Sequence, residues 1–284
     1  MRSYDLHQHL WPEQLFSALS RRTERPRLRG RVLELATEGE FEIDLDDHRL
    51  EKRLAALDRA EIDVAVVSLP PTLGADGDPE LVDAYHTGIG EIVRASDGRL
   101  LALASGSARE GFAGATVSGR ALVDWPEELT RLLRELEEEG SLLFVHPSMG
   151  RARHDLPSWW PAIVDYTAEM QAAYAAWLAR GAAAFPRLRV VFAILAGGAA
   201  VQLERLRSRG VEARAVRHPN VFLDIASYGR RALELSLATF GVRQLVYGSD
   251  VPVLDAAVTL RALSEFGASV SDAVRRENPS LLLA

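Results

Sequence analysis

Two histidines near the start of the chain are spaced so that they can act on one ligand. His7 and His9 lie one residue apart in the segment Tyr-Asp-Leu-His-Gln-His. On an extended backbone, such residues point to the same side. Neutral imidazole is a common ligand of zinc and similar divalent ions. The spacing therefore predicts part of a metal site, provided that later segments supply further ligands.

Two later segments end in side chains that could complete such a site. His146 follows the apolar run 141–145, and Asp250 follows the run 244–247. Taken alone, each also has a structural explanation, as a satisfied histidine at a strand end or an aspartate in a turn or helix cap. Three imidazoles and one carboxylate, without sulfur, suit zinc, with manganese as an alternative. The expected ligands of one divalent ion are His7, His9, His146 and Asp250.

Alternating strands and helices predict how these side chains are positioned. Eight segments have the pattern of strands: the run before His7, then 62–69, 99–104, 112–117, 141–145, 187–195, 221–224 and 244–247. Helical patterns lie between most of them, including 48–60, 79–95, 126–139, 163–180 and 229–240. This order predicts an α/β fold, a (β/α)8 TIM barrel, as a single domain over residues 1–284. A doubly wound open sheet is disfavoured because no G-x-G-x-x-G motif follows any strand.

Barrel geometry explains why ligands so far apart in sequence can meet. Active groups of such barrels come from the carboxyl ends of the strands. His7 and His9 end the first predicted strand, His146 the fifth and Asp250 the eighth. We therefore expect the four side chains to converge on one rim of the barrel.

Composition excludes several other kinds of protein. The net charge of −7 argues against a nucleic-acid or anionic-membrane partner, and no apolar run reaches eighteen residues, so no membrane span is expected. The chain has no cysteine, which excludes disulfides, thiolate metal sites and a cysteine nucleophile. The single lysine, Lys52, lies in a charged helical pattern, which argues against Schiff-base catalysis. We expect a cytoplasmic protein with a small-molecule substrate, and homodimer formation is left open.

Together the motifs resemble those of the amidohydrolase superfamily. The segments are Asp5-Leu-His7-Gln-His9, Phe144-Val-His146-Pro and Tyr247-Gly-Ser-Asp250-Val-Pro252. The most similar branch is the amidohydrolase-related family that includes aminocarboxymuconate-semialdehyde decarboxylase, and the resemblance extends over nearly the whole chain. It implies a distorted (β/α)8 barrel, a divalent metal ion, and hydrolysis or non-oxidative decarboxylation of a small acid or ring compound.

One position departs from the pattern of this family. The family usually carries a histidine at the end of the sixth strand, before a Gly-rich turn, where it helps to activate the metal-bound water. This chain reads Phe192-Ala-Ile-Leu195-Ala-Gly-Gly, which places Leu195 at that position. Leucine neither binds a metal nor transfers a proton. Asp250 is then the expected general base as well as a ligand, which matches the role of the strand-8 aspartate in hydrolases of the superfamily.

Three residues outside the ligand set are candidates for contact with a substrate. His154, in the loop after His146, either replaces the missing histidine or is a loop histidine in water. Arg120 either binds a substrate carboxylate through two hydrogen bonds or is solvated. Trp11 either lines an apolar pocket or packs the loops above the barrel.

The arginine-rich run and one more histidine lie outside these candidates. The arginine-rich run 21–31 is a solvated loop or an anion-attracting flap over the site. His48, at the start of a helical pattern, is expected on the surface.

Three functions stay open: a metal-dependent hydrolase, a carboxy-lyase of the same family, and a barrel that lost catalysis and binds a small molecule. The presence of all four expected ligands argues against the third, and hydrolysis is our first expectation.

Overall fold

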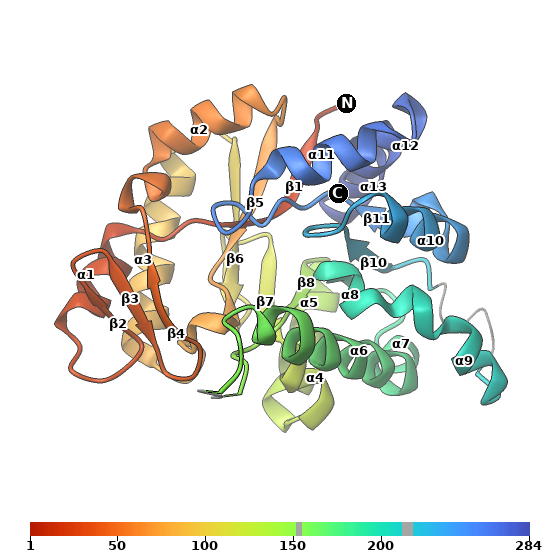
Figure 1. The fold of residues 1–284 in the computed structure, drawn as a ribbon, viewed down its shortest axis with the longest axis horizontal. Coiled ribbons are helices and arrows are strands. Elements are labelled where there is room, and N and C mark those ends of the chain that lie inside the picture. The colour runs from red at the N-terminus through yellow and green to blue at the C-terminus, as the bar shows by residue number, and fades with distance from the viewer. Residues whose placement is uncertain (152–154, 212–217) are drawn as a thin grey trace.

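The computed structural model describes residues 1–151, 155–211 and 218–284. At its centre, eight parallel strands are hydrogen-bonded in the order β1-β5-β6-β7-β8-β9-β10-β11 and curve into a barrel (Figure 1). The strands are β1 (Tyr4–His9), β5 (Val64–Ser68), β6 (Leu100–Ser105), β7 (Gly114–Ser118), β8 (Leu142–His146), β9 (Arg189–Phe192), β10 (Val221–Asp224) and β11 (Leu245–Val246). All eight overlap the predicted segments, so the prediction of a (β/α)8 barrel is confirmed.

The barrel closes between its first strand and the segment that follows its last strand. β1 pairs with β5 on one side. On the other side, the backbone N–H of Leu6 donates to the carbonyl of Tyr247, and the N–H of His9 donates to the carbonyl of Val251. β1 therefore has hydrogen-bonded neighbours on both sides, and the sheet has no open edge there.

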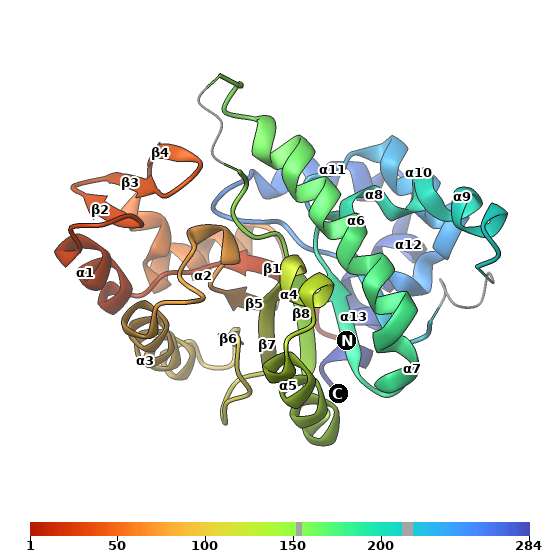
Figure 2. The ribbon, with the colours of Figure 1, turned by 90° about the horizontal axis from the view of Figure 1, so that it is seen from below.

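Helices surround the barrel because its strands are apolar on both faces. All five residues of β5, for example, are buried. The longer helices around it are α2 (Leu50–Arg59), α3 (Pro79–Ala95), α5 (Glu127–Glu139), α6 (Tyr166–Ala176), α10 (Arg230–Phe240) and α11 (Ala256–Ser264) (Figure 2). α5 buries four leucines of one stripe and ends at Gly140 in the left-handed conformation, as its sequence predicts. Within the described residues, no helix is both long enough and apolar enough to cross a bilayer.

A small antiparallel sheet interrupts the barrel pattern after β1 and α1 (Glu13–Arg21). It consists of β2 (Arg27–Arg29), β3 (Val32–Leu35) and β4 (Gly39–Glu42). The prediction of a loop over residues 21–31 is therefore wrong in its second half. The physical reason is that Leu28 and Leu33 face each other across β2 and β3 and are both buried.

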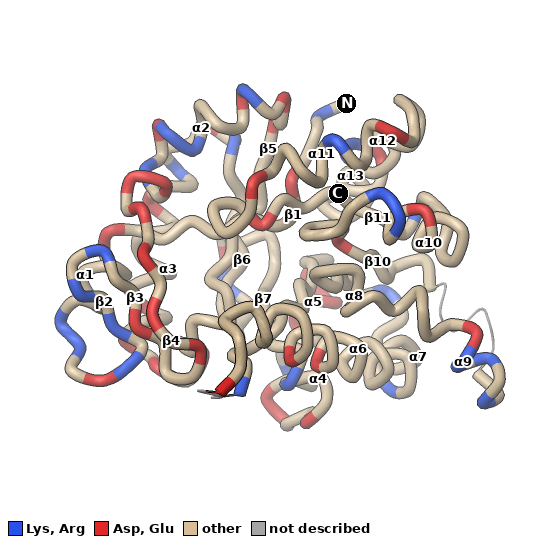
Figure 3. Tube along the Cα trace, viewed as in Figure 1, with Lys and Arg blue, Asp and Glu red and all other residues tan. Residues whose placement is uncertain are grey.

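The arginines of this region are engaged within the fold. Arg25 and Arg27 both bind Glu34, and Arg31 binds Asp44. Figure 3 shows blue and red segments next to each other around α1 and the small sheet. These ion pairs favour a structural role over the anion-attracting flap, because the positive charges already have partners.

Candidate metal centre

Four polar side chains meet at the carboxyl end of the barrel. His7 and His9 lie in the last half of β1, His146 ends β8, and Asp250 follows β11. One ligand atom from each lies within 4.8 Å of the others. Asp250 Oδ1 is 3.5 Å from Nε2 of His7 and 3.2 Å from Nε2 of His9. The structure thus brings together all four side chains that the sequence predicted as ligands.

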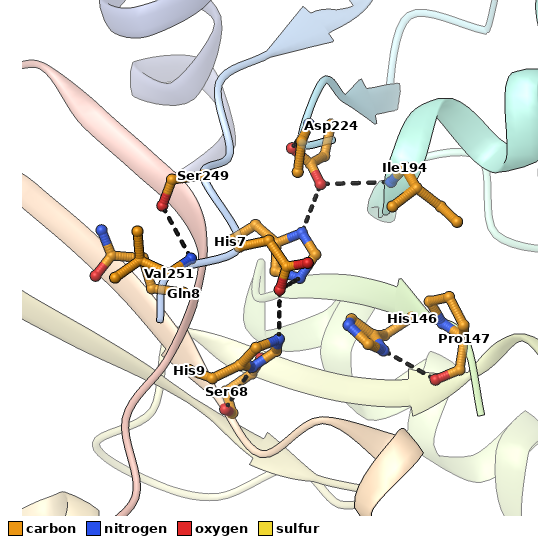
Figure 4. A network of polar contacts seen from close by, with 12 residues as sticks. His7, Gln8, His9, Ser68, His146, Pro147, Ile194, Asp224, Ser249 and Val251 are labelled. Carbon is orange, nitrogen blue, oxygen red and sulfur yellow. Dashed lines mark hydrogen bonds and ion pairs between the residues drawn. The ribbon is translucent and has the colours of Figure 1, made fainter. Parts of the chain in front are cut away.

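The outer nitrogen of each imidazole is held by an oxygen that can only accept a hydrogen bond. Nδ1 of His7 lies 2.6 Å from a carboxylate oxygen of Asp224. Nδ1 of His9 lies 3.1 Å from the carbonyl oxygen of Ser68, and Nδ1 of His146 lies 2.8 Å from the carbonyl oxygen of Pro147 (Figure 4). Each Nδ1 therefore carries a proton and donates it outward. In the neutral ring, Nε2 keeps its lone pair, and this is the tautomer that binds a metal ion.

Two buried atoms of this cluster have no hydrogen-bond partner among the described residues. They are Nε2 of His7 and Oδ1 of Asp250. A lone pair and a carboxylate oxygen that face each other in a buried site repel each other unless a positive charge lies between them. The donor set therefore fits a divalent cation. The Asp250 side chain is 16% exposed and that of His7 is fully buried, so the cluster is open to solvent on the side of Asp250.

The electrostatics of the centre favour positive charge. Burial lowers the pKa of His7, but Asp224 and Asp250 outweigh it and raise the pKa to about 9. Burial raises the pKa of Asp250, but His7 and His9 lower it to a net value below its ordinary one. Burial and the neighbouring imidazoles hold the pKa of His146 well below its usual range. A proton on His7 and a cation in the centre would compete for the same negative surroundings.

Asp224 is a residue of the site that the sequence did not assign. It ends β10, is fully buried, and holds His7 through Oδ2, while its Oδ1 accepts from the backbone N–H of Ala226. A carboxylate behind a histidine ligand fixes the ring and raises its basicity. The available signal was its place at the end of the apolar strand 221–224, where barrel enzymes position functional groups.

A second buried layer supports β1 from behind the cluster. Asp5 accepts from Nε2 of Gln8 at 2.7 Å and from the backbone N–H of Ser249 at 3.0 Å. Burial raises the pKa of Asp5 to about 6, although these hydrogen bonds lower it. Arg53 donates to Oε1 of Gln8 and to the carbonyl of His9. This network ties the ligand-bearing end of β1 to α2 and to the segment after β11.

The segment after β9 offers no side chain that can titrate. Residues 193–201 read Ala-Ile-Leu-Ala-Gly-Gly-Ala-Ala-Val, so the histidine expected from the resemblance has no replacement in this segment. Ile194 and Leu195 both adopt positive φ angles, and Leu195 is buried. The backbone N–H of Ile194 points to Asp224 Oδ2 at 3.4 Å. This side of the centre therefore supplies a backbone donor and apolar side chains.

The structure places the other candidates outside the four-residue cluster. Trp11 is buried against His48, with ring centroids 5.3 Å apart, and its backbone N–H donates to His48 Nδ1. The prediction that His48 lies on the surface is therefore wrong, because it packs into this aromatic contact. The side chain of Arg120 is 75% exposed, and its Nε lies 3.5 Å from Oδ2 of Asp124. His154 lies outside the described residues. Substrate contacts of Trp11, Arg120 and His154 stay predictions.

Comparison with known proteins agrees with the barrel fold. The family model described as amidohydrolase matches residues 4–278. Among curated proteins, none matches the chain. A similar solved structure is the apo form of IDCase from Metarhizium anisopliae, with 19% identity, a TM-score of 0.76, and coverage of 99% of this chain and 97% of that chain.

Two further similar structures are those of decarboxylases. The 5-carboxyvanillate decarboxylase of Sphingomonas paucimobilis has 16% identity and a TM-score of 0.71, with 99% of this chain and 98% of that chain covered. The dihydroxybenzoic acid decarboxylase of Polaromonas sp. JS666, which contains manganese and the inhibitor 2-nitroresorcinol, has 14% identity and a TM-score of 0.69, with 99% and 96% covered. At these identities the similarity shows the shared fold.

Proposed function

Because the chain belongs to the amidohydrolase family, we propose that it is a metal-dependent enzyme that releases carbon dioxide from a small organic acid. The observation that carries this proposal is the convergence of ligand atoms from His7, His9, His146 and Asp250 within 4.8 Å. These residues would hold one divalent ion, zinc first and manganese as the alternative. When bound, such an ion polarises an oxygen atom of the substrate or of a water molecule.

Asp250 is the residue to which we assign proton transfer. In a decarboxylation the bond between the substrate carbon and its carboxyl carbon breaks, carbon dioxide leaves, and a proton takes its place on the substrate carbon. Asp250, which is partly exposed, can take up a proton from solvent and pass it to that carbon, and it ends the step as the carboxylate with which it began. The charges of His7 and His9 favour that carboxylate, because they lower the pKa of Asp250 against the effect of burial. Asp224 is less suited, because His7 and Ala226 already engage both of its oxygens.

We place decarboxylation ahead of hydrolysis because of the apolar segment after β9. Hydrolysis requires that water is deprotonated and that the leaving atom is protonated, so without a second titratable group Asp250 would have to serve both transfers. Residues 193–201 contain no titratable side chain, and one acid–base helper typically contributes about 10²–10⁴-fold in rate. Decarboxylation needs a single proton on carbon, which one carboxyl group can supply.

Hydrolysis stays the second candidate, on one observation. The pKa of Asp250 lies below its ordinary value, because the imidazoles outweigh the effect of burial. At neutral pH the side chain is therefore ionised, which is the form that a general base requires. Lactones or amides would be the substrates in that case.

Metal content and product analysis test the proposal together. The purified chain is stripped with a chelator, reloaded separately with Zn²⁺ and Mn²⁺, and its metal is measured by mass spectrometry. Each form is then incubated with hydroxybenzoic acids, lactones and amides. We expect about one ion per chain, release of carbon dioxide from at least one acid, and loss of that release in Asp250→Asn.

The outcomes separate the alternatives. Ring opening or amide cleavage without carbon dioxide would establish the hydrolase instead. A chain that binds neither ion and converts no compound would overturn the enzymatic proposal. His218→Ala serves as the matched control, because it removes an imidazole outside the cluster and should leave the metal content unchanged.

A further inference from the structure

Glu38 connects the small sheet to the loop that carries His146. It lies in the turn between β3 and β4, and Figure 1 shows this turn beside the green segment that leads from β8 to α6. Its Oε1 accepts from the backbone N–H of Gly150 at 2.5 Å. Its Oε2 accepts from the hydroxyl of Tyr166, also at 2.5 Å. Both contacts lie at the carboxyl end of the barrel, where the candidate metal centre opens.

The backbone at Gly150 is shaped for this contact. A Cβ atom at this position would lie 2.7 Å from Cβ of Pro161 and 3.3 Å from Oε1 of Glu38. Two other carboxylates hold the same loop: Glu169 accepts from Ser148, and Asp165 accepts from the backbone N–H of Arg151. Residues 148–151 are therefore held by three carboxylates, and Glu38 is the one supplied by the small sheet.

The hydrogen-bond directions at Tyr166 determine what it can offer to a ligand. No cation pairs with Glu38 among the described residues, and its two oxygens accept from Gly150 and Tyr166. A phenol has one proton, and Tyr166 uses it on Glu38, so the phenol oxygen is left with acceptor capacity only. Burial raises the pKa of Tyr166, and Glu38 and Asp250 raise it further, so the phenol stays neutral and lies within the electrostatic reach of Asp250.

We propose that Tyr166 is a specificity-determining residue that accepts a hydrogen bond from a hydroxyl or amino group of the substrate, and that Glu38 is the positioning residue that sets this direction. The inference rests on the proposed function, because it places the substrate at the metal centre. It narrows the substrate to a small acid that carries a hydrogen-bond donor in addition to its carboxylate. A second carboxylate at this place would be disfavoured, because Glu38 and Asp165 already bring negative charge there.

Matched pairs of small acids test the proposal by calorimetry. The probes are the 2-, 3- and 4-hydroxybenzoates and the corresponding fluorobenzoates, in which fluorine is close to a hydroxyl in size but cannot donate. For the Zn²⁺-loaded wild type, we expect at least one hydroxybenzoate to bind about tenfold more tightly than its fluorinated partner. In Tyr166→Phe this ratio should fall to near one, with the affinity for the fluorobenzoate unchanged.

The variant Glu38→Gln tests whether Glu38 sets the hydrogen-bond direction at Tyr166 or only stabilises the fold. Its amide oxygen must still accept from Gly150, so its NH₂ group faces Tyr166 and donates to it. The phenol proton then turns toward the ligand. The corresponding formylbenzoate, whose carbonyl can only accept, should bind more tightly than it does to wild type, and the preference for hydroxyl over fluorine should shrink because that hydroxyl can no longer donate to Tyr166. Tyr4→Phe, which removes a phenol at the opposite end of β1, should behave as wild type.

The two proposals fail in different ways. A wild type that does not discriminate any pair, or a Tyr166→Phe variant that keeps the wild-type ratio, overturns the role of Tyr166 even if the metal analysis supports a loaded centre. A chain without bound metal overturns the proposed function and is detected by that analysis before any probe is added. Circular dichroism of each variant confirms that the fold is intact.

Discussion

Asp224 is the residue on which the orientation of His7 depends. Its Oδ2 lies 2.6 Å from Nδ1 of His7 in a fully buried contact. For Asp224→Asn we expect the affinity for Zn²⁺ or Mn²⁺ to fall about 10–100-fold, because the amide keeps the shape of the carboxylate but not its charge. Calorimetric titration of the chelator-treated protein measures the change. Asp63→Asn, at the far end of the barrel, is the control, and equal dissociation constants in both variants would contradict the role.

His48 predicts a pH dependence of stability. Burial first, and the charge of Arg53 next, lower its pKa to about 3. Between about pH 6 and pH 4 the unfolded chain therefore binds a proton that the folded chain does not, so this contribution to stability is present above pH 6.5 and is lost as pH falls.

The test of His48 compares unfolding at two pH values. In His48→Asn, whose amide oxygen can still accept from Trp11, the decrease in the free energy of unfolding between pH 7 and pH 5 should be smaller by about 1–2 kcal/mol. Urea denaturation at both pH values measures the two decreases. The same decrease in wild type and variant would show that His48 does not titrate between folded and unfolded states as proposed.

Residue type and strand position were enough to predict which four side chains converge, but not which residues support them. His7, His9, His146 and Asp250 each end or follow an apolar run, and this can be read locally. The contact of Asp224 with His7 joins positions 217 residues apart and depends on where the closed barrel places β10 relative to β1. A surface position was predicted for His48 because its side chain is polar. Its burial results from the tertiary contact with Trp11, which the local sequence does not indicate.

At the scale of elements, the turn after β11 is packed directly against the site. A Cβ atom on Gly248 would lie 2.0 Å from Asp224 Oδ1 and 2.6 Å from Cβ of His7. For Gly248→Ala we expect metal affinity to fall at least about tenfold, with a loss of about 1–3 kcal/mol in unfolding free energy from overpacking. Thermal unfolding and metal titration check both. Gly229→Ala, where a Cβ meets nothing within 4 Å, is the control, and similar behaviour of the two variants would contradict the prediction.

The barrel strands could be predicted from the sequence, whereas the small sheet could not. Buried parallel strands are continuous apolar runs, and such runs stand out against the helices around them. β2 has only three residues, Arg-Leu-Arg, and β4 reads Gly-Glu-Phe-Glu. Strands this short and polar are held by cross-strand ion pairs and a few buried leucines, which are visible only once the partners are known.

For the molecule as a whole, we expect bound metal to raise stability. The candidate ligands belong to β1, β8 and the segment after β11, so a cation would bind the folded chain and not the unfolded one. At a free ion concentration of 100 times the dissociation constant, the gain is about 2.7 kcal/mol, or several degrees in melting temperature. Scanning calorimetry with and without chelator measures it. His146→Ala should abolish the difference, and a wild type insensitive to chelator would contradict the expectation.

The global fold was predictable because alternation of strands and helices over this length has few topological solutions. The position of the small sheet at the carboxyl end of the barrel was not predictable in this way. The contacts of Glu38 with Gly150 and Tyr166 span 112 and 128 positions in the sequence. They depend on where the hairpin of β3 and β4 packs on the barrel. Sequence spacing carries no information about that placement.

Closure of the barrel and the candidate chemistry involve the same stretch of chain. The backbone of His7 and His9 bonds to Asp250 and Val251, while their side chains face the cluster. A substitution in this stretch is therefore expected to change catalytic activity and folding stability together. Anyone who evolves it toward new substrates by altering these positions should first install compensating mutations in the outer helices, or variants will be lost to misfolding before their activity can be seen.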